Sequence, residues 1–170
     1  MASARMGEMV ISSDPNEELV ALGLGSCIGL AIVARTAGVA GLAHIVLPES
    51  NDRGDQVGKF ADTAVPELIE KMRRAGAVVR RFETAIAGGA RMFEMSGGLD
   101  IGSRNETAVR AALAKARITV KAAQTGGDTG RTVKIAVGDL LVTVRSAGQP
   151  PETLLEGRKP RATAGAGAAR

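Results

Sequence analysis

Two residues whose types occur only once in this sequence, Cys27 and His44, could together carry out covalent chemistry. Cys27 stands in the glycine-rich stretch GLGSCIG (23–29), and His44 stands in the apolar stretch GLAHIVL (41–47). A thiol needs a base within hydrogen-bond reach to become a thiolate near neutral pH, and imidazole has a pKa suited to that task. The pair therefore predicts nucleophilic catalysis of hydrolysis or acyl transfer, provided that the fold brings the two side chains together.

A purely structural role is the alternative for both residues. Free cysteine is among the most buried residue types, and a lone histidine on an apolar strand is often a core residue with a satisfied hydrogen bond. The position of Cys27 favours chemistry, because it lies among glycines at the junction of two expected strands, where the backbone can turn sharply and present a side chain. Such a turn leaves backbone N–H groups around Ser26 and Cys27 unpaired, so they could stabilise an oxyanion, with Gly25 and Ser26 supporting the loop.

The glycines around Cys27 do not fit a phosphate-binding loop. In a dinucleotide fingerprint the third glycine would come one position before Gly29 and would open a helix, whereas β-branched residues and further glycines follow here. The stretch GDQVGKF (54–60) is one spacer residue short of a Walker loop and has Phe60 where Ser or Thr would bind magnesium. The sequence thus argues against nucleotide binding.

The apolar pattern predicts an α+β fold with many short strands and two main helices on one face of the sheet structure. The first helix carries an apolar stripe within 57–72; Pro66 should either kink it or delay its regular part to about residue 64, and Gly76 should end it. The second helix should begin with a capping box formed by Ser103 and Glu106. Strands are expected over 8–12, 18–25, 28–34, 39–47, 82–87 and 118–124, followed by a hairpin in 132–145 that turns tightly at Gly138-Asp139.

Composition and charge describe a globular chain with an aliphatic core. Hydrophobic residues make up 45% of the 170, with three Phe and neither Trp nor Tyr. The net charge is +4, and about half of it belongs to the segment 149–170. Because the rest of the chain is nearly neutral, and single-strand binders need aromatic stacking platforms, no nucleic-acid partner is expected.

One domain over residues 1–148 is expected, followed by a flexible tail over 149–170 that is rich in Pro, Gly and Ala. The N-terminus has no apolar run of signal-peptide length, and the uncharged run 19–34 is shorter than the ~20 apolar residues of a spanning helix. A single cysteine excludes an internal disulfide and a thiolate zinc cage. The expectation is a cytoplasmic protein without membrane insertion, metal or cofactor.

Longer stretches of the sequence resemble one family. The LGSC loop is followed by an AH..LP segment, and further segments match in order as far as the final hairpin, over about residues 6–146. Together these motifs resemble those of the chemoreceptor glutamine deamidases of bacterial chemotaxis, CheD. The segments that carry the resemblance are LGLGSCIGLAIVARTAGVAGLAHIVLPES, GKFADTAVPELIEKMRRAGA, AIAGGARMF, IGSRNETAVRAAL and ITVKAAQTGGDTGR.

The resemblance implies a three-layer α/β/β fold with mixed sheets, shared with a toxin class of deamidases, and a Cys-His active site without a cofactor. The family's nucleophile falls on Cys27 and its general base on His44. Family members convert selected glutamines of methyl-accepting chemotaxis receptors to glutamates, and the resemblance also implies a CheC-type phosphatase as a partner. The glycine pairs at 88–89 and 126–127 either frame a groove for a receptor helix or are tight turns at sheet ends.

Two positions depart from the family pattern. Ala21 stands where the family often has a threonine, regarded as the third member of the triad, so another group must orient His44: a backbone carbonyl or Ser26. Arg91 stands where the family commonly has Asn, which is interpreted as a change at the surface or in substrate contact. The alternative function is a regulatory binding module that engages a CheC-type phosphatase or receptors with little catalysis.

Overall fold

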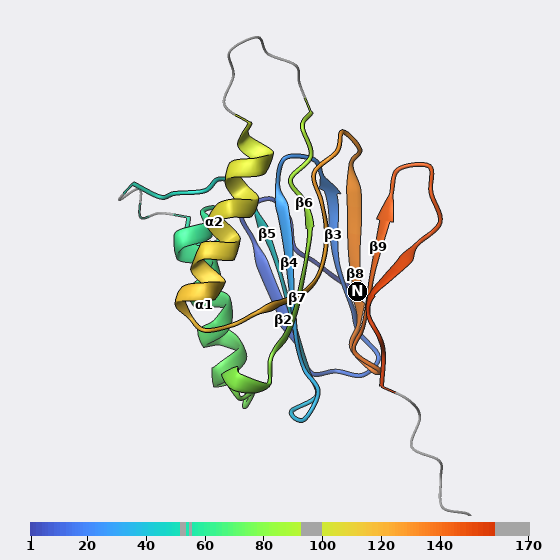
Figure 1. Cartoon of the computed structure of the whole chain (residues 1–170). Coiled ribbons are helices and arrows are strands. Elements are labelled where there is room, and N and C mark those ends of the chain that lie inside the picture. Colours follow the sequence, from blue (N-terminus) through green and yellow to red (C-terminus); the bar gives the residue numbers. More distant parts are fainter. Residues whose placement is uncertain (52–53, 55, 93–99, 159–170) are drawn as a thin grey trace, which may run out of the picture.

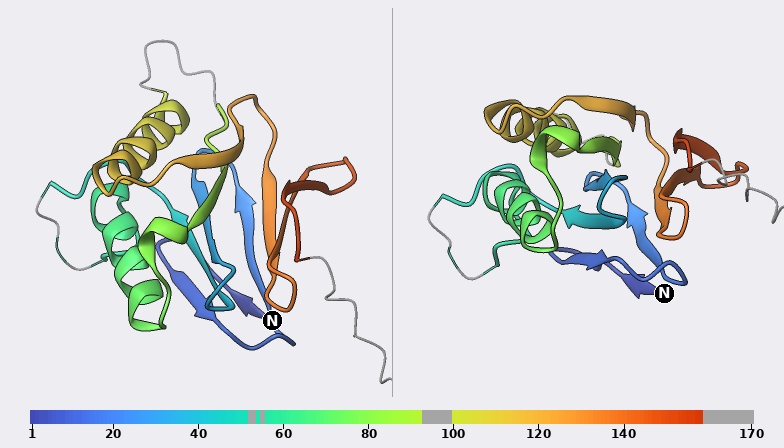
Figure 2. Two further views of the ribbon diagram at one scale, coloured as in Figure 1. Left: turned by 60° about the horizontal axis from the view of Figure 1, so that its bottom comes forward. Right: turned by 90° about the horizontal axis from the view of Figure 1, so that it is seen from below.

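The structure has three layers: two helices, a five-stranded sheet against them, and a second five-stranded sheet on the far side (Figures 1 and 2). It is a computed structural model that describes residues 1–51, 54, 56–92 and 100–158. The predicted α+β fold with both main helices on one face is confirmed. The elements are β1 (Ala2–Ser3), β2 (Met9–Ser12), β3 (Glu18–Leu24), β4 (Ile28–Ala34), β5 (Val39–Ile45), α1 (Ala61–Arg74), η1 (Val79–Arg81), β6 (Glu83–Gly88), α2 (Ile101–Lys115), β7 (Val120–Thr125), β8 (Arg131–Ala136), β9 (Leu141–Ser146) and β10 (Glu152–Leu155).

Each sheet is mixed, with a single parallel pair among antiparallel ones. The inner sheet, which contacts the helices, has the order β2-β5-β4-β6-β7, and its parallel pair is β6 with β7. The outer sheet has the order β1-β3-β8-β9-β10, and its parallel pair is β1 with β3. Because β3 lies in the outer sheet and β4 in the inner one, the chain changes sheet at 25–27, the segment that contains Cys27.

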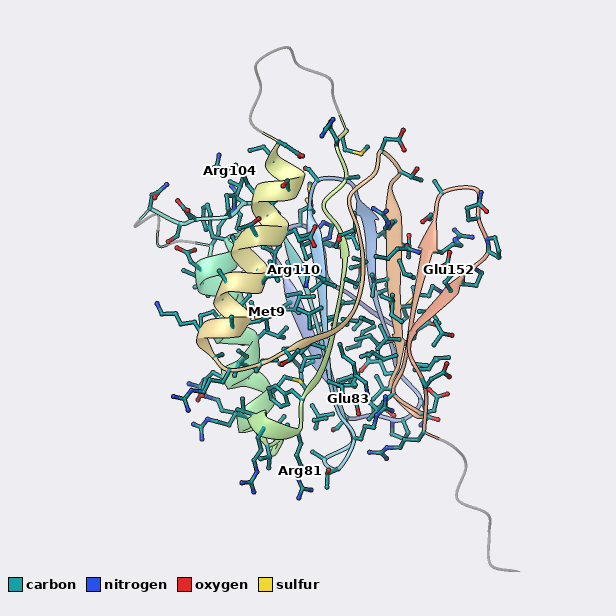
Figure 3. The ribbon with its side chains drawn as sticks, in the orientation of Figure 1. Met9, Arg81, Glu83, Arg104, Arg110 and Glu152 are labelled. Atoms are coloured by element: carbon teal, nitrogen blue, oxygen red, sulfur yellow. The ribbon has the colours of Figure 1, made fainter. Side chains whose placement is uncertain are left out.

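The inner sheet is buried on both faces, so two separate apolar cores form. On β4, Ile28, Leu30 and Ile32 pack towards the helices, whereas Ala31 and Val33 pack towards the outer sheet. Every residue of β4 and β5 is buried, which explains why these two strands are continuous apolar runs. Side chains fill the space between the two sheets (Figure 3).

The first helix begins before residue 64, where one of the two predicted alternatives placed the start of its regular part. It starts at Ala61, so the expectation that its regular part begins near residue 64 is wrong, and Pro66 lies inside it. One lost backbone hydrogen bond is offset by a wholly buried stripe that includes Val65, Leu68 and Met72. The predicted end is confirmed, because Gly76 adopts a φ of +91° and its N–H donates to the Arg73 carbonyl.

The second helix does not begin with the predicted capping box. Its N-cap is Asp100, whose carboxylate accepts a hydrogen bond from the Ser103 N–H at 3.1 Å, so Ser103 lies in the first turn. Aspartate caps a helix as well as serine does, and the earlier start carries Gly102 against the Gly89 carbonyl, where a side chain would clash. Asp100, which was not among the predicted caps, lies three residues before Ser103 and begins the helix.

The predicted strands are confirmed to within about two residues, but the ends of the outer sheet differ from expectation. The β8-β9 hairpin is joined by four residues, 137–140, with Leu140 at a φ of +60°, so the two-residue Gly138-Asp139 turn is wrong. Beyond residue 148 the sheet continues: β10 pairs with β9, and Leu155 is buried. Part of the segment predicted as a tail therefore belongs to the outer sheet, and residues 159–170 lie outside the described part of the chain.

Candidate active site

The loop that carries Cys27 forms where β3 leaves the outer sheet. Ala21 pairs with Val133 and Leu24 with Arg131, so β3 holds one extra residue there, a β-bulge. Gly23, inside the bulge, adopts a φ of +66°. Bulges bend a strand and increase its twist, which turns the chain towards the inner sheet and places Cys27 immediately before β4.

Backbone contacts with the end of β6 hold the loop in place. The Gly89 N–H donates to the Cys27 carbonyl at 2.9 Å, and the Ala90 N–H donates to the Gly25 carbonyl at 2.8 Å. Gly88 approaches so closely that a Cβ at this position would collide with the Cys27 carbonyl oxygen, and its φ of +113° also requires glycine. The first glycine pair thus does more than turn the chain: it packs against the loop of the candidate nucleophile.

Cys27 and His44 face the same side of the inner sheet. His44 pairs with Gly29, and the ladder ends with Ile28 opposite Ile45, one residue short of Cys27. Alternate residues of a strand share a face, so Cys27, two residues before Gly29, is the diagonal neighbour of His44. Diagonal neighbours have Cα atoms roughly 7–8 Å apart, so the two residues are near neighbours on this face, although within the described residues no hydrogen bond joins Nε2 of His44 to the thiol.

The ring of His44 is held by a backbone carbonyl. Its Nδ1 atom lies 3.2 Å from the carbonyl oxygen of Ala4. A carbonyl only accepts hydrogen bonds, so Nδ1 carries the hydrogen and Nε2 is left with a lone pair. The side chain is 2% exposed, and Nε2 has no partner among the described residues. Burial lowers the pKa of His44, and the Ala4 carbonyl opposes part of that effect, so the imidazole is neutral near pH 7 with its free nitrogen available as a base.

Cys27 is a neutral thiol at rest. It is 8% exposed, and burial raises its pKa, opposed only in part by its own backbone N–H. When a neutral thiol and a neutral imidazole share a sheet face in this way, the base must remove the proton as the sulfur attacks. The geometry therefore fits general-base activation better than a preformed thiolate-imidazolium ion pair.

Ala21 lies next to the segment that orients His44. It is fully buried in the core between the sheets. On the neighbouring β1, Ser3 pairs with Val20, and the Ala4 N–H donates to the Val20 carbonyl, so Ala4 continues alongside Ala21. Of the two orienting groups offered by the sequence, a backbone carbonyl or Ser26, the structure provides the carbonyl, and it comes from Ala4.

The backbone N–H groups of the three loop residues, 25–27, differ in whether another residue accepts a hydrogen bond from them. The Gly25 N–H donates to the Gly23 carbonyl at 3.0 Å and is therefore occupied. Within the described parts of the chain, the backbone N–H groups of Ser26 and Cys27 donate to no other residue. The Ser26 N–H, together with the Cys27 N–H, which faces its own thiol, has the chemistry of an oxyanion site.

A groove of about 770 Å³ adjoins the loop. The Arg91 N–H donates to the Gly127 carbonyl at 2.7 Å, and the Arg91 guanidinium lies 3.8 Å from the carboxylate of Asp100. Met92 packs against Gly25, where a Cβ would lie 2.9 Å from its Cγ. The lining residues are Gly89, Arg91, Met92, Asp100, Ser103, Glu106, Gly126, Gly127 and Asp128.

Three contributors to the site escaped sequence reasoning: Ala4, Asn105 and Arg131. Ala4 acts through its backbone, which leaves no signal in the side chain. Asn105 occupies a position of the buried stripe of α2, one turn before Val109, and a polar residue in such a stripe is a detectable signal of a buried hydrogen bond. Arg131 is 9% exposed and donates to the carbonyls of Gly88 and Gly126, which ties the two glycine loops together.

Fold and site define a class: an α+β protein with two packed sheets and a cysteine-histidine pair at their junction. A family model described as CheD chemotactic sensory transduction matches residues 46–146. A protein of Thermotoga maritima named chemoreceptor glutamine deamidase CheD is 42% identical over 149 residues, 86% of this chain and 94% of that protein. The chain therefore belongs to the CheD family.

Further relatives carry the same name with the word probable. One from Clostridium novyi is 42% identical over 139 residues, covering 79% of this chain and 86% of the relative. One from Methanococcus vannielii is 37% identical over 147 residues, covering 85% and 94%. In the described ranges, neither helix combines the length and the apolar character needed to span a bilayer.

Proposed function

We propose that this protein hydrolyses the side-chain amide of selected glutamines on chemotaxis receptors, giving glutamate and ammonia, with Cys27 as nucleophile and His44 as base. The observation that carries the proposal is the orientation of His44: its Nδ1 is bonded to the Ala4 carbonyl, and its free Nε2 belongs to a ring on the same sheet face as Cys27. Membership of the CheD family supplies the substrate class.

The first half of the reaction forms a thioester. As Cys27 Sγ attacks the amide carbon, Nε2 of His44 takes the thiol proton and the carbonyl electrons move onto oxygen. The N–H groups of Ser26 and Cys27 are the donors that would stabilise this oxyanion. When the intermediate collapses, the carbon–nitrogen bond breaks and the imidazolium returns its proton to the leaving group, which departs as ammonia.

The second half releases glutamate. Nε2 of His44 removes a proton from a water molecule as its oxygen attacks the thioester carbon. The carbon–sulfur bond then breaks, and the sulfur recovers the proton held by the imidazole. The net change consumes one water and releases one ammonia, and it needs neither an oxidant nor a reductant.

Exposed apolar side chains around the site would receive the receptor segment. Met92 contacts Gly25, Leu22 lies in the bulge before the loop, and Met6 precedes Gly7, whose N–H donates to the His44 carbonyl. All three are among the most exposed large apolar residues of the described chain, at 44%, 59% and 71% respectively. Apolar residues flanking a target glutamine would bury this area on binding.

The test is mass spectrometry of a receptor cytoplasmic fragment incubated with the protein. Wild type should convert particular glutamines to glutamate, whereas Cys27→Ala and His44→Gln should leave them unchanged. Arg80→Ala, an exposed residue of the short helix η1, serves as the matched control and should retain wild-type activity. Absence of conversion by wild-type protein with an intact thiol would overturn the proposal.

The alternative, a regulatory binding module with little catalysis, is favoured by one observation: Cys27 is nearly buried and its pKa is raised, as in structural cysteines. It predicts tight binding of receptor or of a CheC-type phosphatase with no conversion of glutamine. A binding measurement beside the mass spectrometry separates the two functions. The phosphatase partnership itself stays a prediction.

A further inference from the structure

We infer that Asn105 is a positioning residue that holds Cys27 in register with His44. Its Nδ2 atom donates two hydrogen bonds of 2.9 Å, one to the carbonyl of Ser26 and one to the carbonyl of Val46. Ser26 immediately precedes Cys27, and Val46 is two residues beyond His44. The inference rests on the proposed function for its catalytic consequence, but its structural consequence can be measured separately.

The two carbonyls lie where the β4-β5 ladder has ended. The last pair is Ile28 with Ile45, and continuing that register would place Cys27 opposite Val46. Instead the Val46 N–H turns away and donates to the Lys59 carbonyl at 2.9 Å. The amide of Asn105 therefore bridges the cysteine loop and the histidine strand just beyond the point where backbone pairing stops connecting them.

The other contacts of the loop do not provide this connection. The Gly89 and Ala90 N–H groups hold the carbonyls of Cys27 and Gly25, and both donors follow β6, on the side of β4 away from β5. Without Asn105 the loop would stay attached to the β6 side while its spacing from β5 became free to vary. Misplacement by about 1 Å can cost an enzyme on the order of 100-fold in rate.

The surroundings of Asn105 argue against a role in packing alone. The residue is fully buried on the face of α2 that also carries Val109 and Leu113. Its Oδ1 atom has no partner among the described residues, so the amide is only half satisfied. A buried, half-satisfied polar group is costly. The two bonds to the loop and the strand account for its presence there.

The experiment uses Asn105→Leu, which keeps the same branched arrangement of heavy atoms but cannot donate, and Asn105→Ala as a second variant in case the larger methyl groups of the first prevent folding. Val109→Ala is the matched control, because it removes buried volume one turn along the same helix but removes no hydrogen-bond donor. Each is combined with His44→Gln in a double-mutant cycle. The readouts are the alkylation rate of the single cysteine by iodoacetamide, receptor deamidation and thermal unfolding.

Asn105→Leu should lower the alkylation rate and kcat by ~10-fold or more, with KM changed by less than about twofold. In the His44→Gln background the same substitution should have little further effect, because the base that it positions is gone. Val109→Ala should lower the melting temperature while leaving alkylation unchanged in both backgrounds. Equal effects of Asn105→Leu in both backgrounds, or effects that follow melting temperature as in Val109→Ala, would overturn the inference. The alkylation cycle gives its answer even if wild type deamidates no receptor.

Discussion

The carbonyl oxygen of Ala4 lies 3.2 Å from Nδ1 of His44 and fixes the ring with Nε2 free. Ala4 runs beside Ala21, the position where a threonine was expected from the family pattern. A backbone atom therefore orients the candidate base in this chain, and substitution of the Ala4 side chain cannot remove it. Because His44 is already oriented, a threonine hydroxyl introduced at position 21 is not needed for that purpose.

Ala21→Thr should not raise turnover, and it should lower stability. Ala21 is fully buried between the sheets, so added atoms overpack the core at a cost of about 1–3 kcal/mol. Ala21→Val is the matched control, because it has the shape of threonine without the hydroxyl. Denaturant unfolding and receptor deamidation should give similar values for the two variants. A clear gain in kcat for Thr over both Val and wild type would show that the hydroxyl, and not the Ala4 carbonyl, limits the base.

Stability should fall as the pH drops below about 6.5, because of His44. Burial lowers the pKa of this residue in the folded protein, so the unfolded chain binds the proton more tightly. Between the lowered folded value and the unfolded value, each decrease in pH then favours unfolding. Melting temperatures measured from pH 7.5 down to pH 5 should decrease more steeply for wild type than for His44→Gln. Parallel curves for the two proteins would contradict the lowered pKa.

Glu83 provides a second pH effect in a separate window. Hydrogen bonding from Arg35, and secondarily from Lys121, lowers the pKa of Glu83 to about 2. The folded protein thus holds the ionised form, and this contribution, about 1–2 kcal/mol after allowance for solvent screening, is lost as the pH falls from 4.5 towards 2. Glu83→Gln should lower the free energy of unfolding at pH 7 by that amount without changing deamidation, since Glu83 begins β6 at the end opposite Gly88. A loss of activity would mean that the two ends of the strand are coupled.

In His44→Gln, which has no base to take the thiol proton, alkylation of Cys27 should rise with pH to beyond pH 9 without a plateau near neutrality. Burial raises the pKa of the thiol, so the thiolate, which is the species that reacts, accumulates only in alkaline solution. Because the chain has one cysteine, iodoacetamide consumption reports on this site alone. A rate that stays constant from about pH 6 to pH 8 in this variant would contradict the raised pKa of the thiol.

Gly88→Ala should disrupt the site far more than Gly126→Ala. Both glycines have positive φ, +113° and +77°, so each alanine carries backbone strain of about 1–2 kcal/mol. A Cβ at Gly88 would also collide with the Cys27 carbonyl, whereas a Cβ at Gly126 meets nothing within 4 Å. Deamidation and the melting temperature should therefore fall sharply for Gly88→Ala, while Gly126→Ala remains active with a modestly lower melting temperature. Comparable activity of the two variants would mean that the loop carrying Cys27 can shift to accommodate the added methyl group.

The strands of the inner sheet were predictable because burial on both faces produces uninterrupted apolar runs, as in 28–34 and 39–45. The candidate reactive pair was predictable for a different reason: the types of Cys27 and His44 carry chemistry wherever the fold places them. Short elements such as β1 and η1 lack enough residues to form a pattern. The start of α2 was misplaced because Asp100 and Ser103 are both competent caps and only the packing of Gly102 chooses between them.

The arrangement around the pair could not be predicted from the sequence. The bonds from Asn105 to Ser26 and Val46 join segments far apart in the chain. The orienting group of His44 is a main-chain oxygen, and every residue has one, so its importance depends on register alone. The sequence indicated that some group must orient His44, but only the parallel pairing of β1 with β3 identifies that group as the Ala4 carbonyl.

Because the chain passes from one sheet to the other at 25–27, the two candidate reactive groups lie on the inner sheet but are positioned in part by the outer sheet. Cys27 ends the segment that joins outer-sheet strand β3 to inner-sheet strand β4, and His44 lies on inner-sheet strand β5 but is oriented by Ala4, which follows outer-sheet strand β1. The relative placement of Cys27 and His44 thus depends on how the two sheets pack together. The alkylation rate of Cys27 therefore reports on how the two sheets pack. A slight separation of the sheets would lower that rate and the deamidation rate before the protein unfolds.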